Sequence, residues 1–145
     1  MRNHRELLTG QDGASAVGFA ILAPVMIIVL LVILTAGRLS LAGNAVEAAA
    51  ASAARDASLA RDPWTAQRAA QAAASRSLSQ AGTRCQMLGA ATDTSGLNAP
   101  LGQIGVVRVT VTCTARLSDI GLPGLPGEKT YTSTQISPVD PYRQR

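Results

Sequence analysis

The side chains best suited to chemistry are two cysteines, which are the only cysteines in the chain. Cys85 and Cys113 belong to no C-x-x-C pair and have no histidine nearby, so a zinc or redox site lacks its usual ligands. The favoured interpretation is a structural disulfide, which persists in an oxidising compartment. Closing a loop of this length contributes about 3 to 4 kcal/mol in the chain-entropy model.

The other reactive side chains show no catalytic spacing. His4 is the only histidine and lies in the N-terminal tail, so triads and acid–base pairs have no histidine to use. No serine lies in a G-x-S-x-G elbow, and GLPGLPG at 121–127 lacks the Lys-Ser or Lys-Thr ending of a phosphate loop. The carboxylates are scattered and read as solvated surface: Glu47, Asp56, Asp62, Asp93, Asp119, Glu128 and Asp140. We expect no enzyme, no metal, no cofactor and no small-molecule substrate.

The positive charge does not predict a nucleic-acid partner. The net charge is +4, and the 13 Lys and Arg residues are spread along the chain instead of clustering. Nucleic-acid surfaces gather basic residues on one face and often add aromatic platforms. The chain has four aromatic residues far apart in sequence: Phe19, Trp64, Tyr131 and Tyr142.

One long apolar stretch predicts a membrane anchor. No side chain from Gly13 to Gly37 is charged, and residues 17–36 are almost wholly apolar. At about 1.5 Å per residue such a helix reaches about 30 Å, the thickness of the bilayer core. A buried helix of a soluble protein is the alternative, but the alanine-rich remainder is too small to cover it. We therefore expect a transmembrane helix at 14–37.

Two features inside this stretch bear on helix packing. Pro24 removes one backbone donor and should bend the helix without ending it. Ala14 with Gly18, and Ala16 with Ala20, place small residues four apart, a spacing that allows close approach of another helix in a membrane.

The orientation follows from the cysteines. Arg2 and Arg5 on one side and Arg38 and Arg55 on the other leave the charge rule nearly balanced. A disulfide needs an oxidising compartment, so the C-terminal part is expected outside the cytoplasmic membrane, with residues 1–13 as a cytoplasmic leader. A secreted protein cleaved near Ala42 is an alternative, because Ser40, Leu41 and Ala42 form a small-x-small site.

The region 38–82 is predicted to be helical. Alanine is the strongest helix former, and an apolar stripe recurs at spacings of three and four: Val46, Ala50, Ala53, Ala57 and Ala60. Asp62 and Pro63 read as the N-cap and first residue of a second helix that stops at Gly82. Trp64 is expected to be a packing anchor, while the buried face of this helix is left open.

The region 83–137 is predicted to be a small β domain closed by the disulfide. Residues 89–105 read as turns, and residues 106–117 alternate as a strand. Its inward positions are Val107, Val109, Val111, Cys113, Ala115 and Leu117; its outward positions are Arg108, Thr110, Thr112, Thr114 and Arg116. Two Pro-Gly turns in 121–127 lead to a strand at 129–137, which makes a β-hairpin, and 138–145 is a tail. The fold class is α+β.

Residues 13–38 resemble the N-terminal segment of TadE-like proteins of tight-adherence (Flp) pilus systems. The matching residues, where we also expect transmembrane packing, are Ala16, Val17, Phe19, Ala20 and Pro24. The later alanine-rich and cysteine-bearing segments look similar too, so the resemblance extends over most of the chain. It implies a membrane protein whose partners are pilin-like subunits and an inner-membrane platform.

The resemblance also implies processing by a prepilin-type peptidase. Cleavage after Gly13 makes Ala14 the first residue and Gly18 the fifth, where pilins usually carry glutamate. Gly18 has no charge to pair with a neighbour's terminal amine. This departure from the pilin pattern argues against cleavage and filament insertion by the ordinary mechanism, and it leaves a capping or scaffold role open for a minor pilin-like or assembly protein. The alternative from another class is a membrane-anchored binding module whose strand face, with Arg108, Thr110 and Arg116, recognises a ligand.

Overall fold

The structure is a computed structural model that describes residues 12–100, 102–119 and 126–142, with side chains from residue 18 onward. The chain divides into two compact units, Met1–Gly37 and Arg38–Arg145. We call residues 18–37 the apolar segment and residues 38–145 the folded domain. Helix α1, Asp12–Ser58, runs continuously through the boundary between them. The predicted leader 1–13 lies almost entirely outside the described residues.

The two helices of the folded domain form where the sequence favours them. The residues of the predicted stripe that lie in α1 are buried, with Val46, Ala50 and Ala53 at 1% exposure or less. Helix α2, Pro63–Gln80, starts as predicted, because the Asp62 carboxylate accepts the Thr65 backbone N–H at 2.8 Å. Past its C-cap Ala81, Gly82 has φ +68°, a left-handed conformation that glycine adopts without strain.

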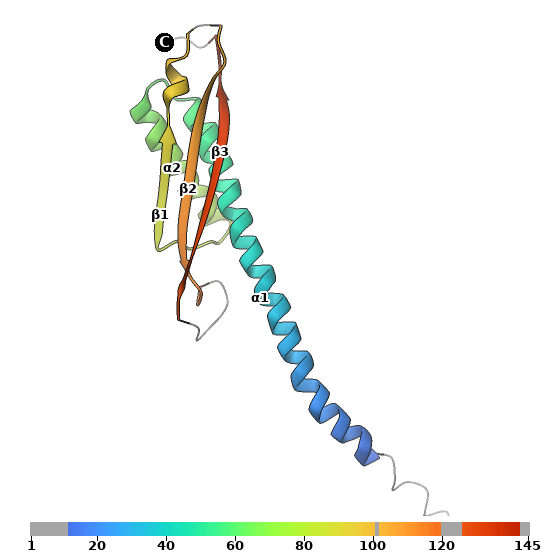
Figure 1. The fold of residues 1–145 in the computed structure, drawn as a ribbon. Coiled ribbons are helices and arrows are strands. Elements are labelled where there is room, and N and C mark those ends of the chain that lie inside the picture. The colour runs from blue at the N-terminus through green and yellow to red at the C-terminus, as the bar shows by residue number, and fades with distance from the viewer. Residues whose placement is uncertain (1–11, 101, 120–125, 143–145) are drawn as a thin grey trace, which may run out of the picture. The chain divides into compact units, whose positions relative to one another are not determined.

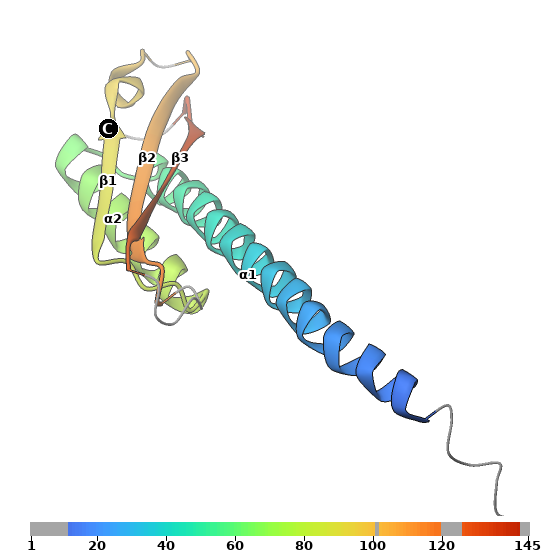
Figure 2. The ribbon, with the colours of Figure 1, turned by 60° about the horizontal axis from the view of Figure 1, so that its bottom comes forward.

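Three antiparallel strands make one sheet in the order β1-β2-β3. They are β1, Met87–Asp93; β2, Gly105–Arg116; and β3, Glu128–Val139, with a short 3-10 helix η1, Ser95–Asn98, between the first two. The helix α2 and the C-terminal part of α1 lie on one face of this sheet (Figures 1 and 2). The predicted α+β class is confirmed, and the predicted hairpin is the β2–β3 pair.

The core of the folded domain joins small helix residues to larger strand residues. Alanines of both helices are buried, and β2 places Val107, Val109 and Val111 against them with no exposed area. The face of α2 that the sequence left open consists of Ala66, Ala70, Ala73, Ala74 and Leu78. Because each alanine side chain adds little apolar area, close approach of the backbones supplies much of the contact.

Four expectations are corrected. Strand β1 spans Met87–Asp93, although turns were predicted from residue 89 onward. Trp64 is 72% exposed and anchors no packing. Thr114, expected to face water, is 8% exposed and its hydroxyl lies 3.0 Å from that of Thr130. Strand β3 runs to Val139, past the predicted start of the tail. The predicted turns at 121–127 fall mostly outside the described residues.

Strand β1 shows why the prediction failed there. Its sequence, MLGAATD, contains glycine, alanine and aspartate, which strands disfavour. Every residue of β1 is nevertheless paired with β2, from Met87 opposite Thr114 to Asp93 opposite Arg108. Pairing with a strong central strand therefore overrides weak local propensity.

Candidate membrane-anchoring and assembly site

The apolar segment presents large side chains on every side of the helix. Each of the following is about half exposed or more: Phe19, Ile21, Leu22, Val25, Met26, Ile27, Ile28, Val29, Leu30, Leu31, Val32, Ile33 and Leu34. Helix α1 is long and apolar enough to cross a membrane, and none of its most apolar window is buried. A core helix of a soluble protein would be mostly buried, so this arrangement indicates a membrane anchor.

The polar and helix-breaking residues of the segment are accommodated within α1. The Thr35 hydroxyl donates to the Leu31 carbonyl oxygen at 2.8 Å, which satisfies the donor without water. Helix α1 continues through Pro24, as expected of a proline inside a membrane helix. Both features suit a helix in an apolar solvent.

The residues proposed for processing and helix packing lie at the N-terminal end of α1. Gly13, Ala14 and Ala16 are within its bounds, but their side chains lie outside the described set. Phe19 is 73% exposed. A Cβ added at Gly18 meets no atom within 4 Å, so the surface there is open to a neighbouring helix.

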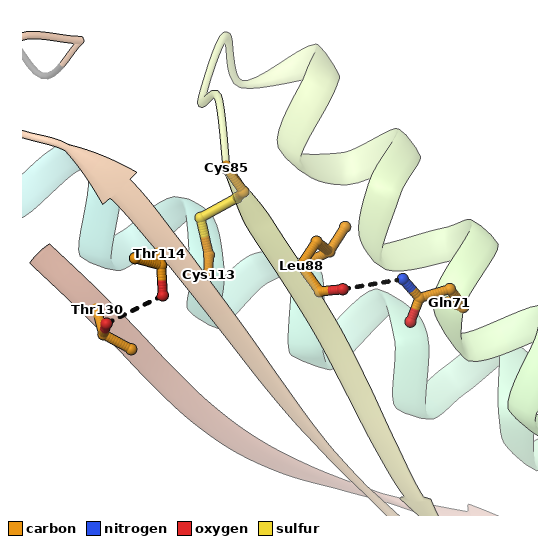
Figure 3. Close-up of a disulfide and its surroundings, with 6 residues drawn as sticks. All are labelled: Gln71, Cys85, Leu88, Cys113, Thr114 and Thr130. Carbon is orange, nitrogen blue, oxygen red and sulfur yellow. Dashed lines mark hydrogen bonds between the residues drawn. A yellow bond between two sulfur atoms is a disulfide. The ribbon is translucent and has the colours of Figure 1, made fainter. Parts of the chain in front are cut away.

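The predicted disulfide is present between Cys85 and Cys113, with Cα atoms 5.4 Å apart (Figure 3). Cys85 follows α2, and Cys113 is a fully buried residue of β2. The bond closes across 28 residues. It holds the end of the helix on the central strand and so positions β1, which starts two residues later, beside β2.

Two glutamines that are not among the predicted site residues fasten α2 to β1. Gln67 donates from Nε2 to the Ala90 carbonyl oxygen, and Gln71 donates to that of Leu88 at 3.4 Å (Figure 3). The two glutamines are about one helical turn apart in α2, and the two acceptors are two residues apart in β1. These spacings match the repeat of a helix and the repeat of a strand. Since β1 is an edge strand, these bonds engage backbone groups of a strand that could otherwise pair with another chain. The four-residue spacing of Gln67 and Gln71 was the signal in the sequence.

The face of the sheet away from the helices carries rows of threonines. Thr110 of β2 lies opposite Thr134 of β3, with hydroxyl oxygens 2.9 Å apart. Arg108 and Arg116, two residues of the alternative binding hypothesis, are exposed on β2, whereas Thr110 is half-buried. Paired threonine hydroxyls therefore make this face of β2 and β3 polar.

Three side chains of the folded domain have pKa values shifted by their immediate surroundings. The Thr65 backbone N–H bonded to Asp62 lowers the pKa of that carboxyl, and the Ser95 backbone N–H lowers the pKa of Asp93 in the same way. Burial raises the pKa of Tyr131. Within the described residues, no three His, Cys, Asp or Glu side chains gather as possible metal ligands. His4 lies outside them.

Comparison with known proteins adds one result. No curated protein and no solved structure matches the chain. One family model does match, over most of α1, and the match does not include α2 or the sheet. It is therefore narrower than the expected resemblance over most of the chain. Residues 13–55 match the family model of the TadE-like proteins, which confirms the resemblance found at the N-terminal helix.

Proposed function

We propose that the chain is a minor pilin-like or assembly protein of a tight-adherence pilus and secretion system. The observation that carries this proposal is the TadE-like match on a helix whose large apolar side chains are exposed. Those side chains offer contact area to lipid and to other membrane helices. The folded domain offers a second surface for contacts with pilin-like subunits outside the cytoplasm.

The proposed topology places the N-terminus in the cytoplasm and the folded domain outside the cytoplasmic membrane. The disulfide between Cys85 and Cys113 supports this, since such bonds persist where thiols are not kept reduced. Protease added to intact spheroplasts is expected to digest the folded domain and leave the apolar segment protected. If the folded domain were protected until the membrane was opened, the opposite topology would be indicated.

The proposed processing is cleavage between Gly13 and Ala14 by a prepilin-type peptidase. N-terminal sequencing of protein from membranes is expected to begin at Ala14. A start after Ala42 would favour the secreted alternative, although Ala42 is buried within continuous α1. With Gly18 fifth in the mature chain, no carboxylate is present there to pair with a neighbouring subunit's amine, which supports a capping or scaffold role.

Co-purification from native membranes tests the assembly role. The full chain, extracted in mild detergent, is expected to carry pilin-like subunits and platform proteins. Gly18→Leu fills the open surface at the proposed packing site and is expected to lower their recovery several-fold without releasing the chain from the membrane. Ile21→Leu, a volume-conserving change on the same helix, is the matched control. Absence of pilus-assembly components from the unmodified chain would refute the role.

The sheet surface favours a second candidate, a membrane-anchored binding module. The observation behind it is the polar face of β2 and β3, where Thr110 and Thr134 pair beside exposed Arg108. A triple Arg108→Gln, Thr110→Ala, Arg116→Gln variant separates the two candidates. Loss of function with membrane partners still bound would favour the binding module, whereas retained function would favour assembly.

A further inference from the structure

A groove opens in the folded domain where the first charged residue after the apolar segment meets the end of α2. Its volume is about 490 Å³, within the range of small-ligand sites. The polar groups come from Arg38 and Asn44 of α1 and from Thr83 and Arg84 after α2. The rest of the lining is mostly small or apolar: Leu41, Ala42, Ala45, Ala81, Gly82 and Ala115, with Asp119 as the acidic member.

The position of Arg38 in the chain ties this groove to the membrane boundary. Arg38 directly follows the uncharged stretch that ends at Gly37, and α1 continues through both residues without interruption. An arginine at the end of a spanning helix is held at the headgroup level of the bilayer. Leu41, less than one turn further along and 67% exposed, adds an apolar surface beside it. The groove therefore combines cationic and apolar groups next to the proposed lipid surface.

The charge balance of the lining favours an anion. Arg38 and Arg84 are both exposed, and neither forms an ion pair with any residue that the structure describes. Two arginines and the carboxylate of Asp119 give the lining a formal charge of +1. An arginine guanidinium binds phosphate oxygens through two parallel N–H bonds, so the two arginines suit a phosphodiester.

The end of helix α2 does not cancel this preference. Helix C-termini carry a partial negative charge on free carbonyl groups. Here the Ala81 N–H donates to the Ser77 carbonyl oxygen at 3.1 Å. The Gly82 N–H donates to that of Ser79 at 3.1 Å, and the Thr83 N–H donates to that of Leu78 at 2.9 Å. The turn through Gly82 thus occupies carbonyls of the last turn and leads directly to Arg84.

We propose that this groove binds the headgroup of an anionic phospholipid, with Arg38 and Arg84 holding the phosphodiester. Asn44 and Thr83 supply neutral hydrogen bonds, and Leu41 contacts the adjoining apolar part of the lipid. This inference rests on membrane anchoring and is independent of the proposed pilus role. Lipid bound here would hold the folded domain at the bilayer surface.

Native mass spectrometry of the full chain in mild detergent tests the site. Phosphatidylglycerol is titrated against phosphatidylcholine of the same acyl chains, and inorganic phosphate is added in a third series. The unmodified chain is expected to retain phosphatidylglycerol, and the pair Arg38→Gln with Arg84→Gln to retain about tenfold less. The matched control is Arg61→Gln with Arg68→Gln, which removes two exposed charges outside the groove and should leave retention unchanged.

Three results would overturn the proposal: equal retention by the groove pair and the unmodified chain, an equal loss in the control pair, or full competition by inorganic phosphate, which would make the ligand a free anion. Asp119→Asn gives an independent check with the opposite sign. It removes the carboxylate from the lining, so retention of phosphatidylglycerol is expected to rise, and unchanged or lower retention would count against the site. Failure to co-purify with pilus components would leave all of these results intact.

Discussion

Two stretches of the same helix follow opposite rules of burial. In the apolar segment of α1, large side chains such as Leu30 and Ile33 are 56% and 62% exposed. In the part of α1 that belongs to the folded domain, the buried side chains are mostly alanines, with Ala49, Ala50 and Ala53 wholly inaccessible, although Val46 is buried too. The larger hydrophobic residues are thus outside and the smaller ones inside. The two stretches of α1 are therefore suited to two different environments, lipid and the interior of a folded domain.

The difference teaches what each stretch is built for. Leucine and isoleucine exposed on all sides are unfavourable in water and favourable in lipid. Alanine contributes little transfer free energy but allows backbones to approach closely. In the folded domain, that approach brings α1 against α2 and the sheet. Substitutions in the apolar segment should therefore affect membrane retention, whereas substitutions in the buried part of α1 should affect the stability of the folded domain.

Charges placed in the apolar segment should produce the largest effect. The double substitution Ile28→Arg with Leu31→Arg replaces two exposed apolar residues near the middle of the stretch. Insertion scales put the change at about 3 to 4 kcal/mol per residue, or about 6 to 8 kcal/mol for the pair. We expect the protein to leave the membrane fraction, as measured by carbonate extraction and immunoblotting.

The same two charges on the other stretch provide the control. Ala48→Arg with Ala51→Arg has the same three-residue spacing, on exposed positions of α1 in the folded domain. This pair should remain in the membrane fraction with a nearly unchanged melting temperature. If both pairs behaved alike, the contrast between the two stretches would be wrong.

Removal of the disulfide should have the next largest effect, and only on the folded domain. Cys85→Ala with Cys113→Ala avoids burying a hydroxyl at fully buried Cys113. The loss in unfolding free energy is expected to be about 3 to 4 kcal/mol, from loop entropy regained by the unfolded chain. Denaturant titration of the full chain in detergent, followed by circular dichroism, measures it. Membrane retention should not change, and equal midpoints for oxidised and reduced wild-type protein would contradict the expectation.

Overpacking the alanine interface should cost less. Ala50→Leu inserts a large side chain where the exposed fraction is 0%, and such changes typically cost about 1 to 3 kcal/mol. Ala51→Leu makes the same change one residue later on the exposed side of α1, where the effect should stay within about 0.5 kcal/mol. Thermal melting of the two variants in the same detergent gives the comparison. A larger loss in Ala51→Leu would mean that the buried face of α1 has been assigned to the wrong side.

The sequence predicted what depends on strong local signals. Asp62 and Pro63 begin α2 because a capping carboxylate and a proline suit the first turn, and the alternation of β2 buries Val107 and Val109 as expected. The pairing of Cys85 with Cys113 followed from the absence of any competing cysteine.

What could not be predicted depends on tertiary partners. Strand β1 exists because β2, the disulfide and two glutamines hold a weak strand sequence in place. Trp64 suggested an anchor by its size, yet it sits at the first turn of α2 on the side away from the core, 72% exposed. The groove at Arg38 and Arg84 joins residues far apart in the chain, and no sequence pattern relates them.

The smallest predicted effect concerns pH and distinguishes the stretch in water from the stretch in lipid. The pKa of Asp62 is lowered in the folded state by its bond from the Thr65 N–H, so its stabilising contribution is present above the unfolded carboxyl's pKa, near 4, and is lost as pH falls through the lower folded value. The apolar segment has no titratable side chain. Asp62→Asn keeps a capping side chain without the charge, so melting of the folded domain in detergent should lose part of its acid dependence, while membrane retention stays constant across the same pH range. An unchanged acid dependence would mean that the Asp62 carboxylate does not cap α2 in solution.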